Sequence, residues 1–71
     1  MNPNLERAIL LYQQSRYDMA AEELRQSLAA QPQDPYSHAL LGLCLAHQEQ
    51  YQEATAEAHQ AIRLGPDFSF A

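Results

Sequence analysis

Lysine and tryptophan are absent from this sequence, and cysteine occurs only once. Four arginines stand against nine carboxylates, which gives a formal net charge of −5 at pH 7. This sign is unfavourable for contact with the phosphates of nucleic acids or of anionic membranes, so we expect neither as a partner. The lone thiol of Cys44 cannot form an internal disulfide and fits a reducing compartment. We therefore expect a cytoplasmic protein.

Long apolar segments are missing as well. The N-terminal part has no basic start, and its apolar run from Ala8 to Leu11 is far shorter than the roughly 20 residues of a membrane span. The 71 residues make at most one small domain, and a core of that size supplies only about 3–5 kcal/mol of net stability. No disulfide is available to stabilise so small a fold further.

A repeat runs through the chain. Tyr17 and Tyr51 begin two similar segments, YDMAAEELRQSLAAQP and YQEATAEAHQAIRLGP, which both end in proline. Further identical pairs at the same offset are Leu11/Leu45, Gln14/Gln48, Ala20/Ala54, Glu23/Glu57, Gln26/Gln60 and Pro32/Pro66. Periods of about 20 to 50 residues indicate stacked helical or stranded units, none of which buries its apolar face alone.

Each unit divides into two helices. Asn2-Pro3 and Asp34-Pro35 place a side-chain acceptor at the N-cap and a proline at the first helical position. The helices are expected to turn at Ser15-Arg16 and at Glu49-Gln50, and Gly65, Pro32 and Pro66 are expected to end the second helix of each unit.

The sequence therefore predicts an all-α fold of four antiparallel helices. The helices are expected at about residues 3–14, 18–30, 35–48 and 52–64. The first unit would span 1–34 and the second 35–66, and residues 67–71 would be the start of a third unit or a packing tail.

Small residues recur where the helices are expected to pack. Helix 35–48 is apolar around nearly its whole circumference, so it must be covered on several sides. Alanine on the facing helices lets the backbones approach closely. The positions expected at these contacts are Ala8, Ala20, Gly42, Ala54 and Ala61. Tyr17 and Tyr51 are expected to fill the space between the two helices of each unit.

The order of these residues has a known counterpart. The second unit has Leu41-Gly42, Ala54, Ala61 and Pro66, and the first has Ala8, Leu11, Ala20, Leu24, Ser27 and Pro32. This pattern resembles the tetratricopeptide repeat, a helix-turn-helix unit of about 34 residues with the signature W-x2-L-G-x2-Y, A-x3-F and P. Asn4 and His38 occupy the tryptophan position, while Leu45 and Ala58 replace the aromatic residues of the second unit. The resemblance covers essentially the whole chain.

The resemblance implies a binding scaffold without catalysis, whose first helices line a groove for a peptide or a partner's helix. Carried over to this sequence, the groove residues would be Asn2, Leu5, Ile9, Tyr12, Gln13, Tyr36, Ala39, Leu43 and His47. The helical spacing agrees, because Leu5, Ile9 and Tyr12 form one stripe. Some members capture a terminal carboxylate with lysine and asparagine, but here Leu5 and Ile9 stand in those places. An amphipathic helix or apolar peptide is the expected ligand.

A second interpretation gives the chain an assembly role without a separate ligand. The last helix turns Ala58 and Ile62 toward a neighbour that the sequence only begins, and the tail offers Phe68 and Phe70 as partial cover. A second copy could supply that neighbour, by packing face to face about a two-fold axis or by exchanging helices, and so form a homodimer. The chain could equally be a fragment that continues into further repeats.

Other functional patterns are weak. At about 100° per residue, His38 and His47 point to opposite sides of one helix, and Cys44 with His47 supplies only two of the four ligands that a structural zinc needs. No serine or cysteine stands beside a base in an arrangement for nucleophilic catalysis. We expect no metal, no cofactor and no enzymatic activity. A row of glutamates is expected to face solvent: Glu49, Glu53 and Glu57.

Overall fold

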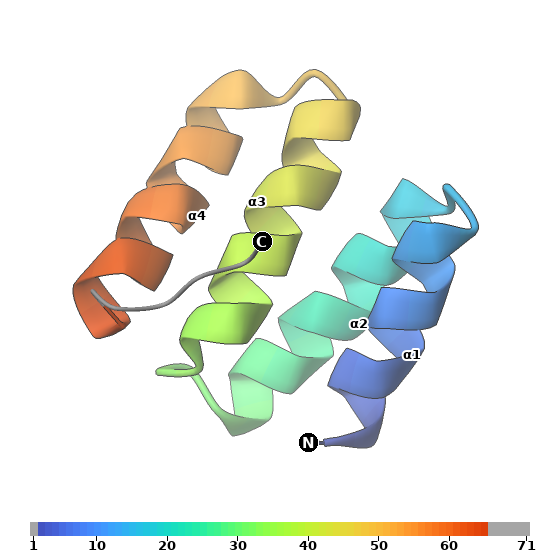
Figure 1. The fold of residues 1–71 in the computed structure, drawn as a ribbon, viewed down its shortest axis with the longest axis horizontal. Helices are drawn as coiled ribbons and strands as arrows, with labels where there is room; N and C mark the ends of the chain where they lie inside the picture. Colours follow the sequence, from blue (N-terminus) through green and yellow to red (C-terminus); the bar gives the residue numbers. More distant parts are fainter. Residues whose placement is uncertain (1, 66–71) are drawn as a thin grey trace.

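Four α-helices make up most of the described chain. The computed structural model describes residues 2–65. The helices are α1 (Pro3–Gln13), α2 (Tyr17–Ala30), α3 (Pro35–His47) and α4 (Tyr51–Leu64), and no strand occurs among the described residues (Figure 1). The prediction of an all-α fold of helical hairpins is confirmed. The expected third unit at 67–71, including Phe68 and Phe70, lies outside the described residues.

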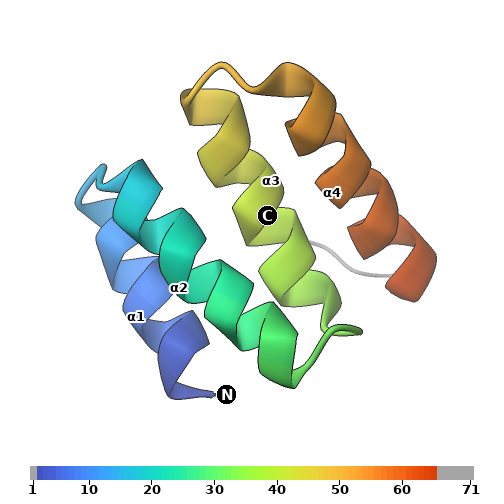
Figure 2. The ribbon, with the colours of Figure 1, turned by 180° about the vertical axis from the view of Figure 1, so that it is seen from behind.

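The helices lie side by side in chain order, with α1 and α4 at the two ends of the row (Figure 1). Figure 2 shows the same order from behind. Each helix contacts the next, and α1 also has a smaller contact with α3. Within residues 2–65, α4 contacts α3 alone. One side of α4 is therefore left without a neighbouring helix in this part of the chain.

Side-chain caps begin α1 and α3. Asn2 Oδ1 accepts the backbone N–H of Leu5 at 2.7 Å, and Asp34 Oδ1 accepts that of Tyr36 at 3.1 Å. The residue after each cap is proline, whose missing N–H is no loss at the first position of a helix. The two Asx-Pro pairs thus fix where these helices start.

The turns within the two hairpins share one geometry. Ser15 and Glu49 occupy equivalent places in the two units, and both have a φ of 63°. In each turn this residue and the next donate backbone hydrogen bonds to the last carbonyls of the preceding helix, at 2.9–3.0 Å. This is a Schellman motif, in which glycine usually takes the left-handed position. Gly65 does end α4 as expected, but with a φ of −146°.

The core fills the space where α1, α2 and α3 meet. Its buried hydrophobic residues are Leu5, Ala8, Ala20, Ala21, Leu24, Leu40, Leu41, Cys44 and Leu45. Two fully buried serines lie with them, and the Ser27 and Ser37 hydroxyl oxygens are 2.9 Å apart. Asn2 Nδ2 donates to Ser27 at 3.0 Å, and Ser37 donates to Asp34 Oδ2 at 2.8 Å. If the Ser27 hydroxyl donates to Ser37, every donor in this series has an acceptor: Asn2 donates to Ser27, Ser27 to Ser37 and Ser37 to Asp34. These hydrogen bonds join the N-terminal caps of α1 and α3 to α2.

Candidate functional site

The residues predicted to line one groove are spread over several separate places. Leu5 belongs to the core and is only 4% exposed, so it offers little surface to a ligand, and its contact with one stays a prediction. Its side chain is covered where α1, α2 and α3 pack together. Ile9 is half-buried against the same core, and Gln13 is exposed at the end of α1. The other predicted residues belong to a hollow, an aromatic cluster and a second groove.

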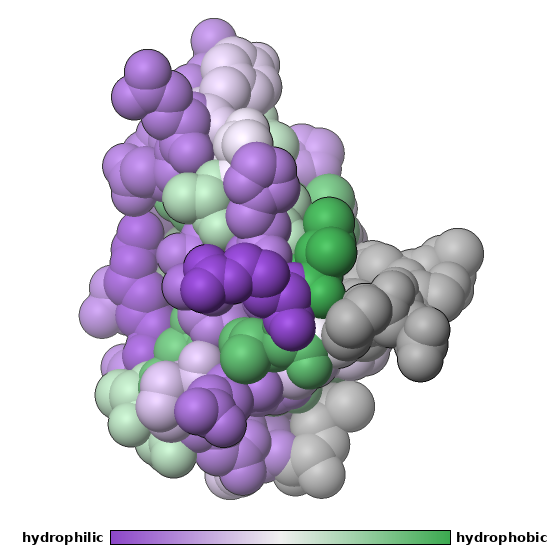
Figure 3. Space-filling view, turned by 90° about the vertical axis from the view of Figure 1, so that its left-hand side faces the viewer, coloured by the Kyte–Doolittle hydropathy of each residue, from purple (hydrophilic) through white to green (hydrophobic). Residues whose placement is uncertain are grey.

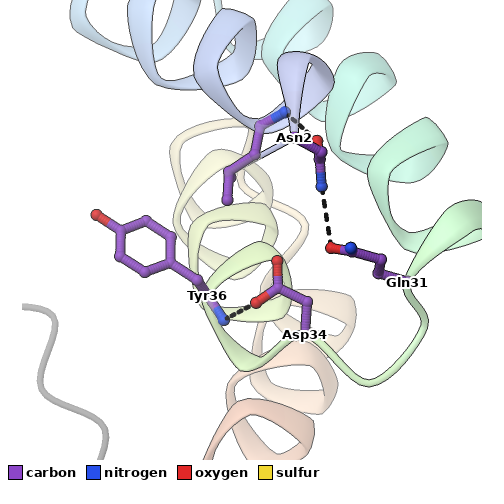
Figure 4. Close-up of a pocket in the computed structure, with 5 residues that line it drawn as sticks. Asn2, Gln31, Asp34 and Tyr36 are labelled. Atoms are coloured by element: carbon purple, nitrogen blue, oxygen red, sulfur yellow. Dashed lines mark hydrogen bonds between the residues drawn. The ribbon is translucent and has the colours of Figure 1, made fainter.

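The hollow lies beside the start of α1 and α3. It has a volume of about 530 Å³ and is lined by Asn2, Leu5, Gln31, Asp34 and Tyr36. Figure 4 shows Asn2 and Gln31 pointing toward each other, with Asn2 Nδ2 donating to Gln31 Oε1 at 3.2 Å. The Asp34 carboxylate already accepts the Tyr36 N–H and the Ser37 hydroxyl. The Asn2 and Asp34 side chains in this hollow are thus used for capping.

An aromatic cluster joins the ends of α1 and α3. The hydroxyl of Tyr12 lies 3.3 Å from His47 Nε2, and the His47 ring stacks on Tyr17 with centroids 4.1 Å apart. Burial, followed by the neighbouring Tyr17 and Cys44, raises the pKa of Tyr12. Two predicted groove residues, Tyr12 and His47, therefore contact each other and hold the first hairpin against α3.

A second groove runs between α3 and α4. Its volume is about 300 Å³, and no charged side chain is among its lining residues. We call it the α3/α4 groove. Its lining residues are Ala39, Gly42, Leu43, Ala46, Tyr51, Ala54, Thr55 and Ala58. The two helices come close together at Gly42, since a Cβ built on it would lie 3.2 Å from the carbonyl oxygen of Ala54. Two predicted groove residues, Ala39 and Leu43, therefore face α4.

The equivalent surface of the first hairpin is occupied by α3. Ala21 and Leu24 of α2 are at most 1% exposed, whereas their counterparts in the second unit, Thr55 and Ala58, are exposed. Tyr17 is half-buried, but Tyr51 is 62% exposed, so the prediction that Tyr51 fills a space between helices is wrong. The cause is position in the row, because α3 covers this side of α2, whereas no described helix covers the same side of α4.

Each hairpin also contains a polar contact at the position of the missing tryptophan. Asn4 Nδ2 donates to Glu23 Oε1 at 3.0 Å, and His38 Nδ1 lies 2.6 Å from Glu57 Oε1. Glu57 therefore packs against α3, and the prediction that it belongs to a solvent-facing row is wrong. The signal in the sequence was the matched spacing, since the members of both pairs are 19 residues apart. Sequence reasoning had treated the two positions separately.

Sites for chemistry are not evident among residues 2–65. No three His, Cys, Asp or Glu side chains in this range are grouped to hold a metal ion. His38 is engaged with Glu57 and with the Pro32 carbonyl, whereas His47 lies in the aromatic cluster. Burial raises the pKa of the Cys44 thiol to about 11, which disfavours the reactive thiolate. Within the same range, none of the helices has the length and apolar character that crossing a membrane requires.

Comparison with known proteins agrees with this architecture. A family model described as tetratricopeptide repeat matches residues 5–67, which is most of the chain. No curated protein and no solved structure gives a match. The matched range contains nearly all of both helical hairpins, together with the close approach at Gly42 and the alanines of α4. This chain therefore belongs to the tetratricopeptide repeat family, whose units generally mediate interactions between proteins.

Proposed function

We propose that this chain is a non-catalytic protein-interaction scaffold that holds an amphipathic helix in the α3/α4 groove. The proposal rests on the equivalent surface of the first unit. There α3 packs on α2 and buries Ala21 and Leu24. The surface that holds a helix in the first unit has no helix over it in the second unit among residues 2–65. α3 contributes one wall of this groove, and α4 contributes the second.

The helix that fits can be described from α3 itself. Ser37 contacts Ser27 and His47 stacks on Tyr17, so the stripe of α3 that faces α2 contains these two residues. Leu40 and Cys44 lie on the same stripe and are buried. A ligand helix would thus present mainly small or apolar side chains at alternating intervals of three and four residues. Basic residues on its other face would speed association with a chain of net charge −5.

A peptide with the sequence of residues 34–48 is a direct probe, because it carries the stripe that already packs on the equivalent surface. We expect its addition to the ¹⁵N-labelled protein to shift the amide signals of Leu43, Ala54 and Ala58, with little change around the N-terminal hollow. A peptide of the same composition in scrambled order should leave the spectrum unchanged.

Two alanines of α4 give a matched pair of variants. Ala58 lines the α3/α4 groove, whereas Ala56 is exposed outside it. Ala58→Glu should weaken peptide binding by about tenfold or more, since it places an unpaired charge in an apolar contact, and Ala56→Glu should have no such effect. Equal binding by the two variants, or signal changes centred on Tyr36, would contradict the proposal.

A further inference from the structure

The exposed side of α4 contains a regular stripe of uncharged residues. Tyr51, Thr55, Ala58 and Ile62 follow one another at intervals of four, three and four residues, which places them on one face of the helix. All four are exposed, with Tyr51 at 62% and Ile62 at 61%. We call these four residues the α4 stripe. Figure 3, which looks onto the α4 side, shows apolar patches within a mostly hydrophilic surface.

The α4 stripe corresponds to the residues of α2 that lie against α3. The counterparts in the first unit are Tyr17, Ala21, Leu24 and Leu28, all of them buried or packed against the core. The stripe is thus built to lie against an antiparallel helix. Its larger members, Tyr51 and Ile62, stand at the two ends, and the small Thr55 and Ala58 lie between them.

From this geometry we propose that the occupant is a second copy of this chain, which pairs α4 with α4 antiparallel about a two-fold axis. This inference rests on the proposed function, since the stripe includes part of the α4 wall of the α3/α4 groove. The intervals of four, three and four read the same in both directions. An antiparallel partner therefore sets Tyr51 against Ile62 and Thr55 against Ala58, so that the small residues meet at the centre and the large ones close the ends.

Charge does not oppose this pairing. Gln52 and His59 flank the stripe on its outer edge. Gln52 of one copy would lie near His59 of the other copy across the two-fold axis. Glu57 is directed to His38 on α3, and Glu53 lies on the opposite side of α4 from the stripe. No pair of carboxylates is brought together at the contact.

A head-to-tail arrangement is disfavoured by the sequence of α1. The residues of α1 that correspond to the α2-facing stripe of α3 are Pro3, Glu6, Leu10 and Gln13, all exposed. If α1 of a second copy entered the α3/α4 groove, Glu6 would take the place that Leu40 occupies in the filled contact. An unpaired carboxylate in an apolar contact is costly. The two-fold contact avoids this cost, and it keeps the Ser27–Ser37 hydrogen bond within each copy.

Sedimentation over a wide concentration range tests the dimer. The contact of one helix face is small beside the roughly 1,600 Å² of a standard interface, so we expect a dimer that dissociates on dilution. Ile62→Glu should weaken it by about tenfold or more by burying an unpaired charge. Leu10→Glu is the matched control, since Leu10 is 58% exposed, lies at the other end of the row and receives the same charge. A monomer at every concentration, or equal effects of the two variants, would overturn the proposal.

Disulfide formation tests the antiparallel register. A mixture of the T55C and A58C proteins should form crosslinked dimers faster than either protein alone, because residue 55 faces residue 58 of the other copy. Cys44 is buried and does not compete. Faster crosslinking of one variant with itself would refute this register. Repeating the residue 34–48 peptide titration on Ile62→Glu separates the two proposals, because Ile62 is not a groove-lining residue. We expect this variant to bind the peptide: loss of peptide binding would count against the groove, whereas a dimer unaffected by the substitution would count against the pairing of α4 with α4.

Discussion

Substitution of Gly42 measures how closely α3 and α4 are packed. A Cβ at this position would lie 3.2 Å from the Ala54 carbonyl oxygen and 3.6 Å from the Ala58 nitrogen. Both atoms belong to the backbone of α4, so they cannot move aside as the end of a flexible side chain can. Ala8, the counterpart in α1, is fully buried, which shows that the other hairpin accommodates a methyl group at the same position.

The expected magnitudes follow from two opposing effects. Replacing glycine inside a helix gains about 1 kcal/mol of helix propensity, and overpacking a close contact costs about 1–3 kcal/mol. Gly42→Ala should therefore be nearly neutral. For Gly42→Leu the larger side chain meets α4 directly, and we expect a net loss of about 1–2 kcal/mol, which lowers the melting temperature by roughly 5–15 °C in a domain of this size.

Thermal unfolding followed by far-ultraviolet circular dichroism checks this series. Ala56→Leu, at an exposed position of α4, is the control for adding a leucine to a helix without a close neighbour. We expect this control to melt within a few degrees of the unchanged protein. The reasoning would be refuted if Gly42→Leu melted no lower than Ala56→Leu, because the distance between α3 and α4 could then not be what limits residue 42.

Four further predictions concern the turns, the buried polar contacts and the thiol. Glu49→Gly should raise stability by about 0.5–1 kcal/mol in urea unfolding, since glycine adopts the φ of 63° without steric cost; a loss would show that the Glu49 side chain has a stabilising contact. Ser27→Ala should cost about 1–3 kcal/mol because it leaves its buried partners unpaired, and an unchanged urea midpoint would argue against the serine network. His38→Ala should lower the free energy of unfolding by about 1 kcal/mol, because the hydrogen-bond partners of His38 are partly exposed. A melting temperature equal to that of the unchanged protein would disprove this. Because burial raises the pKa of Cys44 from 9.0 to about 11, an unfolded chain loses the thiol proton first, so stability present below pH 9 should fall as the pH rises toward 11. The raised pKa of Tyr12 acts in the same direction, and Cys44→Ala should make the fall shallower without abolishing it.

Local sequence signals were sufficient for the helices and their starts. The Asx-Pro pairs at residues 2 and 34 act through bonds within one turn of the chain, as the 2.7 Å contact from the Leu5 N–H to Asn2 shows. The period of the repeat likewise identifies, within each unit, the side of a helix that must be covered by a neighbour. Gly42 could be recognised for the same reason, because a glycine within an apolar helix marks a close approach. These features depend on neighbours along the chain, so they can be read from it.

The sequence could not decide which of two equivalent positions is covered. Tyr17 and Tyr51 have the same place in the period, yet only Tyr17 is packed against α3, because burial depends on whether another helix follows in the row. Leu5 is almost fully buried for the same reason, since α3 packs over its side of the first hairpin. The left-handed Glu49 and the His38–Glu57 contact also arise from how the helices meet. Periodicity identifies the face that needs a neighbour, but only the packing of whole helices determines where that neighbour is present.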